Sequence, residues 1–216
     1  MKEFAVIGLG RFGISLSQTL AGLGYSVLAI DRSEELVQQI SDTVSHAVVA
    51  DATEEEALKA LGIRNFDVVI VAIGQDMQAS ILTTIILKDI GIKMVVAKAL
   101  NELHGKVLEK IGADKVVYPE RDMAIRLAHG LTASNVLDYM ELNSEYSVEE
   151  VVVPEKMIGK TLGHLNLRAK CGITIIAVKK QSGLLVPGPG ADTVFESGDI
   201  AIVIGNRRGL KHLEEQ

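Results

Sequence analysis

A short glycine-rich segment constrains the fold of this 216-residue chain more than any other feature. Residues 4–7 are apolar and strand-like, and a GxGxxG pattern follows them directly before a helical pattern. The first glycine of such a pattern permits a tight turn, the second lets the backbone approach a phosphate, and the third lets the helix pack on the strand. The segment therefore predicts a phosphate-binding turn. Its residues are Gly8, Gly10, Arg11, Phe12 and Gly13.

An acidic residue follows the next strand-like run at the spacing of a ribose ligand. Asp31 comes directly after residues 26–30 and lies 18 residues beyond Gly13. This is close to the roughly 20 residues expected for the carboxylate that accepts the ribose hydroxyls of an adenine nucleotide. In the competing interpretation, the glycines only form a turn and Asp31 only caps a helix. That interpretation needs the strand, the spacing, the helix and the acid to coincide by accident.

Six short apolar runs alternate with helical patterns over the first 118 residues. Such alternation is typical of parallel strands joined by crossover helices, and continuous apolar character within a run indicates burial on both faces. The sequence therefore predicts an α/β fold, with a Rossmann-type doubly wound parallel sheet followed by a small α+β C-terminal domain. The expected strands cover residues 4–7, 26–30, 47–49, 68–72, 94–97 and 115–117.

The expected domain boundary lies after a long helix. Residues 1–137 are predicted to form the nucleotide-binding domain, which ends in a crossover helix at 120–137 that could bridge subunits. The composition shifts near Asn143, so we expect residues 138–145 to form a linker. Residues 146–216 contain strand-like runs separated by glycine and proline turns, and they are predicted to form the second domain.

Charge and composition exclude several function classes. The net charge is −6 and no basic run is longer than Arg207-Arg208, so nucleic acid is not an expected partner. No segment reaches the roughly 18 to 20 apolar residues that cross a bilayer, so direct membrane insertion is not expected. The single cysteine, Cys171, excludes an intrachain disulfide and a zinc cluster built from cysteine.

Three polar residues near the predicted site each have two interpretations. Arg11 places a guanidinium in the phosphate-binding turn, which suits the terminal phosphate of ATP or ADP; alternatively, it faces solvent or an acidic neighbour. Arg32 is either solvated or a clamp for a ribose 2′-phosphate. Asp51 follows the third expected strand, where its carboxylate can meet the adenine edge, cap the next helix, or do both.

No catalytic constellation is visible in the sequence. A dehydrogenase needs a general acid or base and a substrate cavity, and no nucleophile motif or P-loop lysine pattern occurs. The histidines are scattered without metal-ligand spacing, and we expect them on the surface or on helix faces. We therefore predict a ligand-binding regulatory subunit. The competing classes are an NAD(P)-dependent oxidoreductase and an NADH-binding redox sensor. The histidines are His46, His104, His129, His164 and His212.

The helix expected at residues 76–90 has more apolar positions than one core-facing stripe requires. Apolar surface of this extent is normally covered in an assembly. We therefore expect the surplus to be buried between subunits. The apolar residues are Ala79, Ile81, Leu82, Ile85, Ile86, Leu87 and Ile90.

Several extended strings resemble the RCK family, the KtrA/TrkA-type regulators of bacterial potassium uptake. Strings of this length are far more specific than a glycine pattern alone, and the similarity spans the whole chain. The resemblance implies a cytoplasmic homo-octameric ring, docked at the inner face of the cell membrane on a potassium transporter subunit of the KtrB/TrkH type. The strings are residues 4–13, 51–53, 62–67, 71–74, 106–114 and 118–123.

The resemblance also implies the ligands of the first domain. In the family, ATP or ADP changes the shape of the ring, although some TrkA-like relatives favour NAD or NADH. Glu120 matches a glutamate that helps bind an activating cation such as Mg²⁺, Ca²⁺ or Na⁺ near the phosphates; alternatively, it only starts a helix after Pro119. The implied nucleotide contacts are Gly8, Gly10, Arg11, Phe12, Gly13, Asp31, Arg32, Asp51, Ala52, Thr53, Ala72, Ile73, Gly74 and Lys98.

The second domain resembles the RCK C-domain, which in KtrA-like members binds cyclic di-AMP between two subunits. Leu162 and Arg168 match the positions of that ligand site, and Arg168 is expected to meet a phosphate. Gly163 departs from the pattern, because an apolar residue is usual beside Leu162. The alternative is that these residues only pack at an exposed rim.

Overall fold

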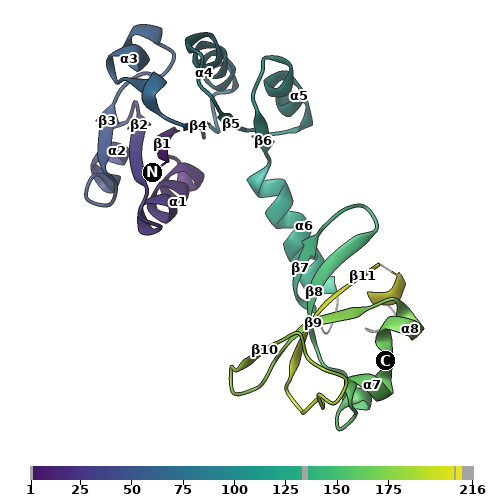
Figure 1. Cartoon of the computed structure of the whole chain (residues 1–216). Helices are drawn as coiled ribbons and strands as arrows, with labels where there is room; N and C mark the ends of the chain where they lie inside the picture. The colour runs from purple at the N-terminus through teal and green to yellow at the C-terminus, as the bar shows by residue number, and fades with distance from the viewer. Residues whose placement is uncertain (1, 133–135, 207, 211–216) are drawn as a thin grey trace. The chain divides into compact units, whose positions relative to one another are not determined.

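A computed structural model describes residues 2–132, 136–206 and 208–210, which fold as two units, Met1–Pro119 and Glu120–Gln216 (Figure 1). Within these ranges, no helix has both the length and the apolar character needed to cross a bilayer. Each unit has its own sheet and its own core. The predicted fold class is therefore confirmed.

The first unit is built on a six-stranded parallel sheet. All neighbouring pairs are parallel and the strand order is β3-β2-β1-β4-β5-β6. Each predicted strand is present, with ends within one residue of those expected. The strands are β1 (Glu3–Ile7), β2 (Ser26–Asp31), β3 (His46–Val49), β4 (Val68–Val71), β5 (Val95–Lys98) and β6 (Lys115–Val117).

Helices cover both faces of this sheet, as the continuous apolar runs require. Successive residues of β1 point into different cores: Val6 packs with residues of α1, whereas Ile7 packs with buried side chains of α4 and α5. The helices α1 and α2 lie on one face, and α3, α4 and α5 lie on the other. Their bounds are α1 (Arg11–Gly22), α2 (Glu34–Ile40), α3 (Glu55–Ala60), α4 (Met77–Ile90) and α5 (Glu102–Lys110).

Local capping explains where several of these helices begin and end. The side chains of Ser33, Asp76 and Asn101 accept hydrogen bonds from backbone N–H groups in the first turns of α2, α4 and α5. Gly91 ends α4 with φ 87°, a conformation that glycine adopts without strain. Asp51 does not cap α3, because the residue before that helix is Glu54.

The second unit contains all of α6 (Pro119–Thr132) except its first residue, and a five-stranded antiparallel sheet in the order β10-β9-β11-β8-β7. The short helices α7 (Leu162–Leu165) and α8 (Leu167–Cys171) pack their leucines against the sheet core around Phe195. The strands are β7 (Val136–Glu141), β8 (Tyr146–Val152), β9 (Thr174–Lys179), β10 (Leu185–Pro187) and β11 (Ile200–Asn206).

The helix end and the linker expected from the sequence differ from the structure. The helix was expected to reach residue 137, but β7 begins at Val136, and residues 133–135 lie outside the described ranges. Residues 138–145 are not a linker, because they form most of β7 and its turn into β8. The Asn143 side chain accepts from the backbone N–H groups of Glu145 and Tyr146. The polar segment that resembles a linker is thus the turn of a hairpin.

Candidate nucleotide site

The first unit gathers the predicted nucleotide residues at one edge of its sheet. Because all six strands are parallel, their carboxyl ends meet at the same edge, and the chain leaves β1 and β4 in the middle of the sheet. Ligands of such folds bind beyond these ends, where the strand order reverses. This edge carries the connections from β1 to α1 and from β4 to α4.

The glycine turn after β1 is packed so closely that two of its positions have no room for a side chain. A Cβ on Gly8 would lie 2.8 Å from the backbone nitrogen of Ile73, and the φ of Gly8 is 97°. A Cβ on Gly13 would overlap the carbonyl oxygen of Gly8. Ala72 and Ile73, which follow β4, therefore press against the turn, and this contact holds its backbone in place.

Gly10 has a different environment, because a Cβ there would meet no described atom within 4 Å. It precedes α1, whose first turn has neither a capping side chain nor an acidic residue. The first N–H groups of a helix lack intrahelical partners and carry the positive end of the helix dipole. An open space beside uncapped N–H groups is the arrangement that binds a phosphate.

Two positively charged side chains lie near the start of α1. Arg11 is the first residue of α1 and is exposed. Lys98 ends β5 and is 7% exposed; its Nζ lies 5.7 Å from the centre of the Phe12 ring. The same Nζ is 3.3 Å from the position that a Cβ on Gly74 would occupy. The fold thus brings Phe12, Gly74 and Lys98 together, although 86 residues separate the first from the last.

The Asp31 side chain joins the glycine turn to the connection after β2 through two hydrogen bonds. Its Oδ2 accepts from the backbone N–H of Leu9 at 2.6 Å, and its Oδ1 accepts from the N–H of Ser33 at 2.8 Å. An ionised carboxylate has about four acceptor positions, so both oxygens can accept further hydrogen bonds. The carboxylate therefore lies beside the glycine turn, which is where the ribose assignment requires it.

Asp51 forms a compact turn with the two residues that follow it. Its Oδ1 accepts from both the N–H and the hydroxyl of Thr53, at 2.9 Å and 2.7 Å. The hydrogen bond from the Thr53 hydroxyl contributes most to lowering the pKa of Asp51, and the nearby charge of Arg32 also lowers it. Asp51 is exposed, and both of these hydrogen bonds use its Oδ1, not its Oδ2. Because the charge of Arg32 lowers the pKa of Asp51, Arg32 lies close enough to interact with this carboxylate.

The predicted cation ligand belongs to the other unit of the chain. Glu120 is exposed in the first turn of α6, in the second unit. Among the described residues, no three histidine, cysteine or acidic side chains gather in a set that could hold a metal ion. Glu120 alone therefore does not make a metal site within one chain.

The predicted second ligand site is on the surface of the C-terminal unit. Leu162 begins α7 and is half-buried, whereas Arg168 is exposed on α8. A Cβ on Gly163 would lie 3.2 Å from the Cβ and the carbonyl oxygen of Ala191. This close approach explains the glycine that departs from the family pattern.

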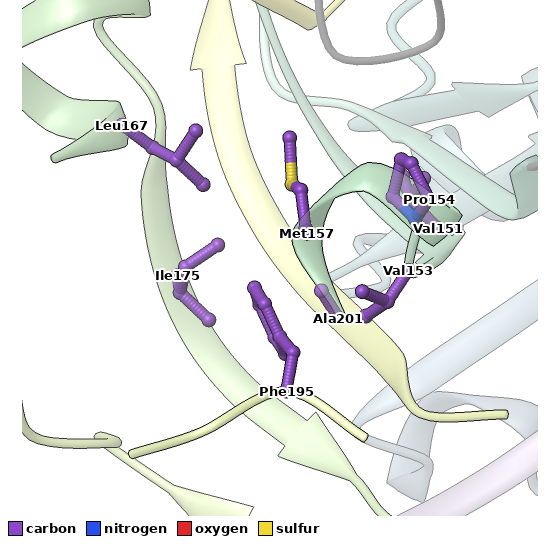
Figure 2. Close-up of a pocket in the computed structure, with 8 residues that line it drawn as sticks. All are labelled: Val151, Val153, Pro154, Met157, Leu167, Ile175, Phe195 and Ala201. Atoms are coloured by element: carbon purple, nitrogen blue, oxygen red, sulfur yellow. The ribbon is translucent and has the colours of Figure 1, made fainter. Parts of the chain in front are cut away.

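A small apolar cavity lies within the described part of this unit, and Figure 2 shows it between Met157, Phe195 and Leu167. Its volume of about 10 Å³ is close to the least that holds a single water molecule. A nucleotide cannot enter it.

Two buried polar residues of the first unit were not identified from the sequence. Thr83 of α4 is fully buried, and its hydroxyl donates to the carbonyl oxygen of Ala52 at 3.2 Å. His104 of α5 is also fully buried; its Nδ1 accepts from the N–H of Leu100 at 3.3 Å, and burial lowers its pKa. His212 lies outside the described residues. The Thr83 contact joins residues 31 positions apart, and the burial of His104 depends on the packing of α5. No local sequence signal therefore marks either feature.

Comparison with known proteins places the chain in a family. The TrkA-N domain matches residues 4–119 and the TrkA-C domain matches residues 148–216. Ktr system potassium uptake protein C of Bacillus subtilis is 50% identical over 215 residues, which are 100% of this chain and 97% of the relative. Ktr system potassium uptake protein A of Vibrio alginolyticus is 41% identical over 204 residues, or 94% and 92% of the two chains.

Solved structures share the fold. A structure described as the GsuK channel bound to NAD has a TM-score of 0.70 and 16% identity; it covers 100% of this chain, which spans only 40% of the channel chain. The GsuK structure bound to ADP has a TM-score of 0.52 and 28% identity over 60% of this chain and 33% of the other. The predicted family is thus confirmed. The chain belongs to the RCK family, and it carries the TrkA-N and TrkA-C domains of KtrA-type potassium-uptake regulatory subunits.

Proposed function

We propose that this chain is a regulatory subunit that binds ATP and ADP and thereby controls a membrane potassium transporter. The observation that carries the proposal is the uncapped start of α1, with open space at Gly10 and the Lys98 amine beside Phe12. Helix N–H groups alone suffice for the pyrophosphate of a dinucleotide. Two additional cations, Arg11 and Lys98, suit the extra charge of a terminal phosphate.

The bound nucleotide would contact three strand ends. Its phosphates would accept hydrogen bonds from the N–H groups of the glycine turn, its ribose hydroxyls would donate to Asp31, and its adenine amino group would donate to Asp51. These contacts hold a ligand and do not break its bonds. The proposed role is therefore regulatory.

Regulation follows if ATP and ADP bind two shapes of the protein with different affinity. A ligand shifts a conformational equilibrium only by the difference between its affinities for the two states. We propose that the partner is a transporter subunit of the KtrB/TrkH type and that the protein acts at the inner face of the cell membrane. The Ktr potassium uptake relatives support this partner.

We also propose that the chain assembles into an octameric ring. Leu82 and Ile85 of α4 are 45% and 36% exposed, and Met123 and Leu127 of α6 are both 58% exposed. Apolar side chains grouped on helices in this way are normally covered by another subunit. Glu120 lies in the first turn of α6, and an activating cation there would take its other ligands from a second subunit or from the nucleotide phosphates.

Cyclic di-AMP is the ligand that we propose for the C-terminal domain. The exposed guanidinium of Arg168 can meet a phosphate, and Leu162 offers an apolar contact to a base. The ligand would lie on the surface, between two subunits.

Calorimetry with four nucleotides tests the proposal against its main alternative, an NAD(H)-binding regulator, which the NAD-bound GsuK structure favours. Nucleotide-depleted protein is titrated with ATP, ADP, NAD and NADH. We expect ATP and ADP to bind one per chain, and NAD and NADH to bind more weakly. Tight binding of NADH without binding of ATP would instead support the alternative.

A further inference from the structure

One buried hydroxyl connects the predicted adenine-recognising turn to the middle of α4. Thr83 is fully buried within α4, 31 residues along the chain from Ala52. Its Oγ1 donates to the carbonyl oxygen of Ala52 at 3.2 Å. Ala52 is itself only 6% exposed, so this hydrogen bond is shielded from water.

The bond acts on the peptide group that orients Asp51. The carbonyl of Ala52 and the N–H of Thr53 belong to the same planar peptide unit. Thr83 holds the carbonyl end of that unit, and the Oδ1 of Asp51 accepts from its N–H end at 2.9 Å. Fixing the plane of this peptide therefore fixes the direction of the N–H group that holds the Asp51 carboxylate.

We propose that Thr83 is a positioning residue, which sets the orientation of the Asp51 carboxylate and so the preference of the site for adenine over other bases. This inference rests on the proposed function, in which Asp51 accepts from the adenine amino group. Thr83 is not expected to touch the nucleotide. It acts through the peptide that joins Ala52 to Thr53.

The chain provides a matched control at the next position. Thr84 is also fully buried in α4, but its hydroxyl donates to the carbonyl oxygen of Ser80, within the same helix. Thr84→Val and Thr83→Val remove the same group from the same helix and leave side chains of equal shape. Only Thr83→Val removes a contact with the turn.

The test compares ATP with ITP, because inosine lacks the amino group that Asp51 would recognise. Affinities of the full chain are measured by calorimetry, and thermal unfolding is measured for each variant. In Thr83→Val we expect ATP affinity to fall about 3- to 10-fold, the factor that corresponds to one net hydrogen bond. ITP affinity should stay within about 2-fold by the same reasoning. Thr83→Ser, which keeps the hydroxyl, should retain the wild-type ratio of ATP affinity to ITP affinity, and so should Thr84→Val.

Three results would overturn the proposal. The first is an equal loss of ATP and ITP affinity in Thr83→Val. The second is a change in the ratio of ATP affinity to ITP affinity in Thr84→Val as large as that in Thr83→Val. The third is a wild-type protein that binds ATP and ITP equally. None of these results removes ATP binding itself. Failure of the proposed function would instead appear as a wild-type protein that binds no adenine nucleotide. If Thr83→Val does not fold, Thr83→Ala is measured in its place, with Thr84→Ala as its control.

Discussion

Individual side chains at the carboxyl edge of the sheet do more than one task. Asp31 holds the N–H groups of Leu9 and Ser33, so it fixes the glycine turn before any ligand is present. The same carboxylate would then accept from the ribose. Positioning of this kind lowers the ordering that a ligand must impose when it binds.

Asp31→Ala should weaken ATP, ADP and NAD alike, because all three have the same adenosine ribose. The expected loss is about 1 to 3 kcal/mol of binding free energy, the cost of removing a charged hydrogen-bond partner. Calorimetry measures it. Asp42→Ala serves as the control, because Asp42 is exposed and precedes β3, away from the carboxyl edge. Unchanged affinity in Asp31→Ala would reject the ribose role.

Arg11 should distinguish nucleotides by their phosphates. In Arg11→Gln we expect ATP and ADP to lose about 1.5 to 3 kcal/mol of binding free energy, since hydrogen bonds to charged groups are worth this much, whereas AMP should lose little. Arg64→Gln is the control, because Arg64 is exposed shortly before the start of β4. Equal losses for AMP and ATP would show that Arg11 does not meet a terminal phosphate.

At the scale of elements, α5 begins with a hydrogen bond that depends on an uncharged histidine. The Nδ1 of His104 accepts from the N–H of Leu100 in the connection from β5, whose last residue is Lys98. A protonated Nδ1 is a donor and cannot accept this bond. The start of α5 is therefore sensitive to pH.

Stability of the first unit should fall as pH drops below about 6.5, the ordinary pKa of histidine. Burial lowers the pKa of His104 in the folded protein, so the unfolded chain binds its proton first and gains stability relative to the folded state. The slope from one group is at most about 1.4 kcal/mol per pH unit. Urea unfolding at pH 7.5 and 5.5 should show a smaller loss in His104→Gln than in the wild type.

His46→Gln, which replaces an exposed histidine in the same unit, should keep the wild-type dependence. If His104→Gln and His46→Gln change the pH dependence equally, the assignment to the start of α5 is wrong.

Elements were predictable where local patterns agree with burial. The strands of the first sheet are buried on both faces, so each is a continuous apolar run, and the helices begin at recognisable caps such as Asp76. The prediction for residues 120–145 was wrong in part. β7 alternates exposed Met140 with buried Tyr139, and its turn is polar, so this segment has no continuous apolar run. The contact of Thr83 with Ala52 was not predictable, since nothing local pairs two residues 31 positions apart.

For the whole molecule, the exposed apolar surface of α4 predicts association. Ile85→Glu places a charge on that surface, which should disfavour burial against another subunit. We expect the mass of the assembly in solution, measured by light scattering, to fall. Gln38→Glu adds the same charge on an exposed position of α2 and should leave the mass unchanged.

Both variants should keep the wild-type unfolding temperature of the first unit, because Ile85 is 36% exposed. A full-size assembly of Ile85→Glu would show that this part of α4 is not an interface. A wild-type chain that remains monomeric at micromolar concentration would contradict the proposed ring itself.

The central claim is that a phosphate chain binds at the start of α1, and a crystal structure of the protein grown with ATP tests it most directly. The account predicts the triphosphate against the N–H groups after Gly10, with its terminal phosphate near Arg11 or Lys98 and its adenine at Asp51. An empty space at Gly10, or one filled by protein side chains in the presence of saturating ATP, would contradict the account.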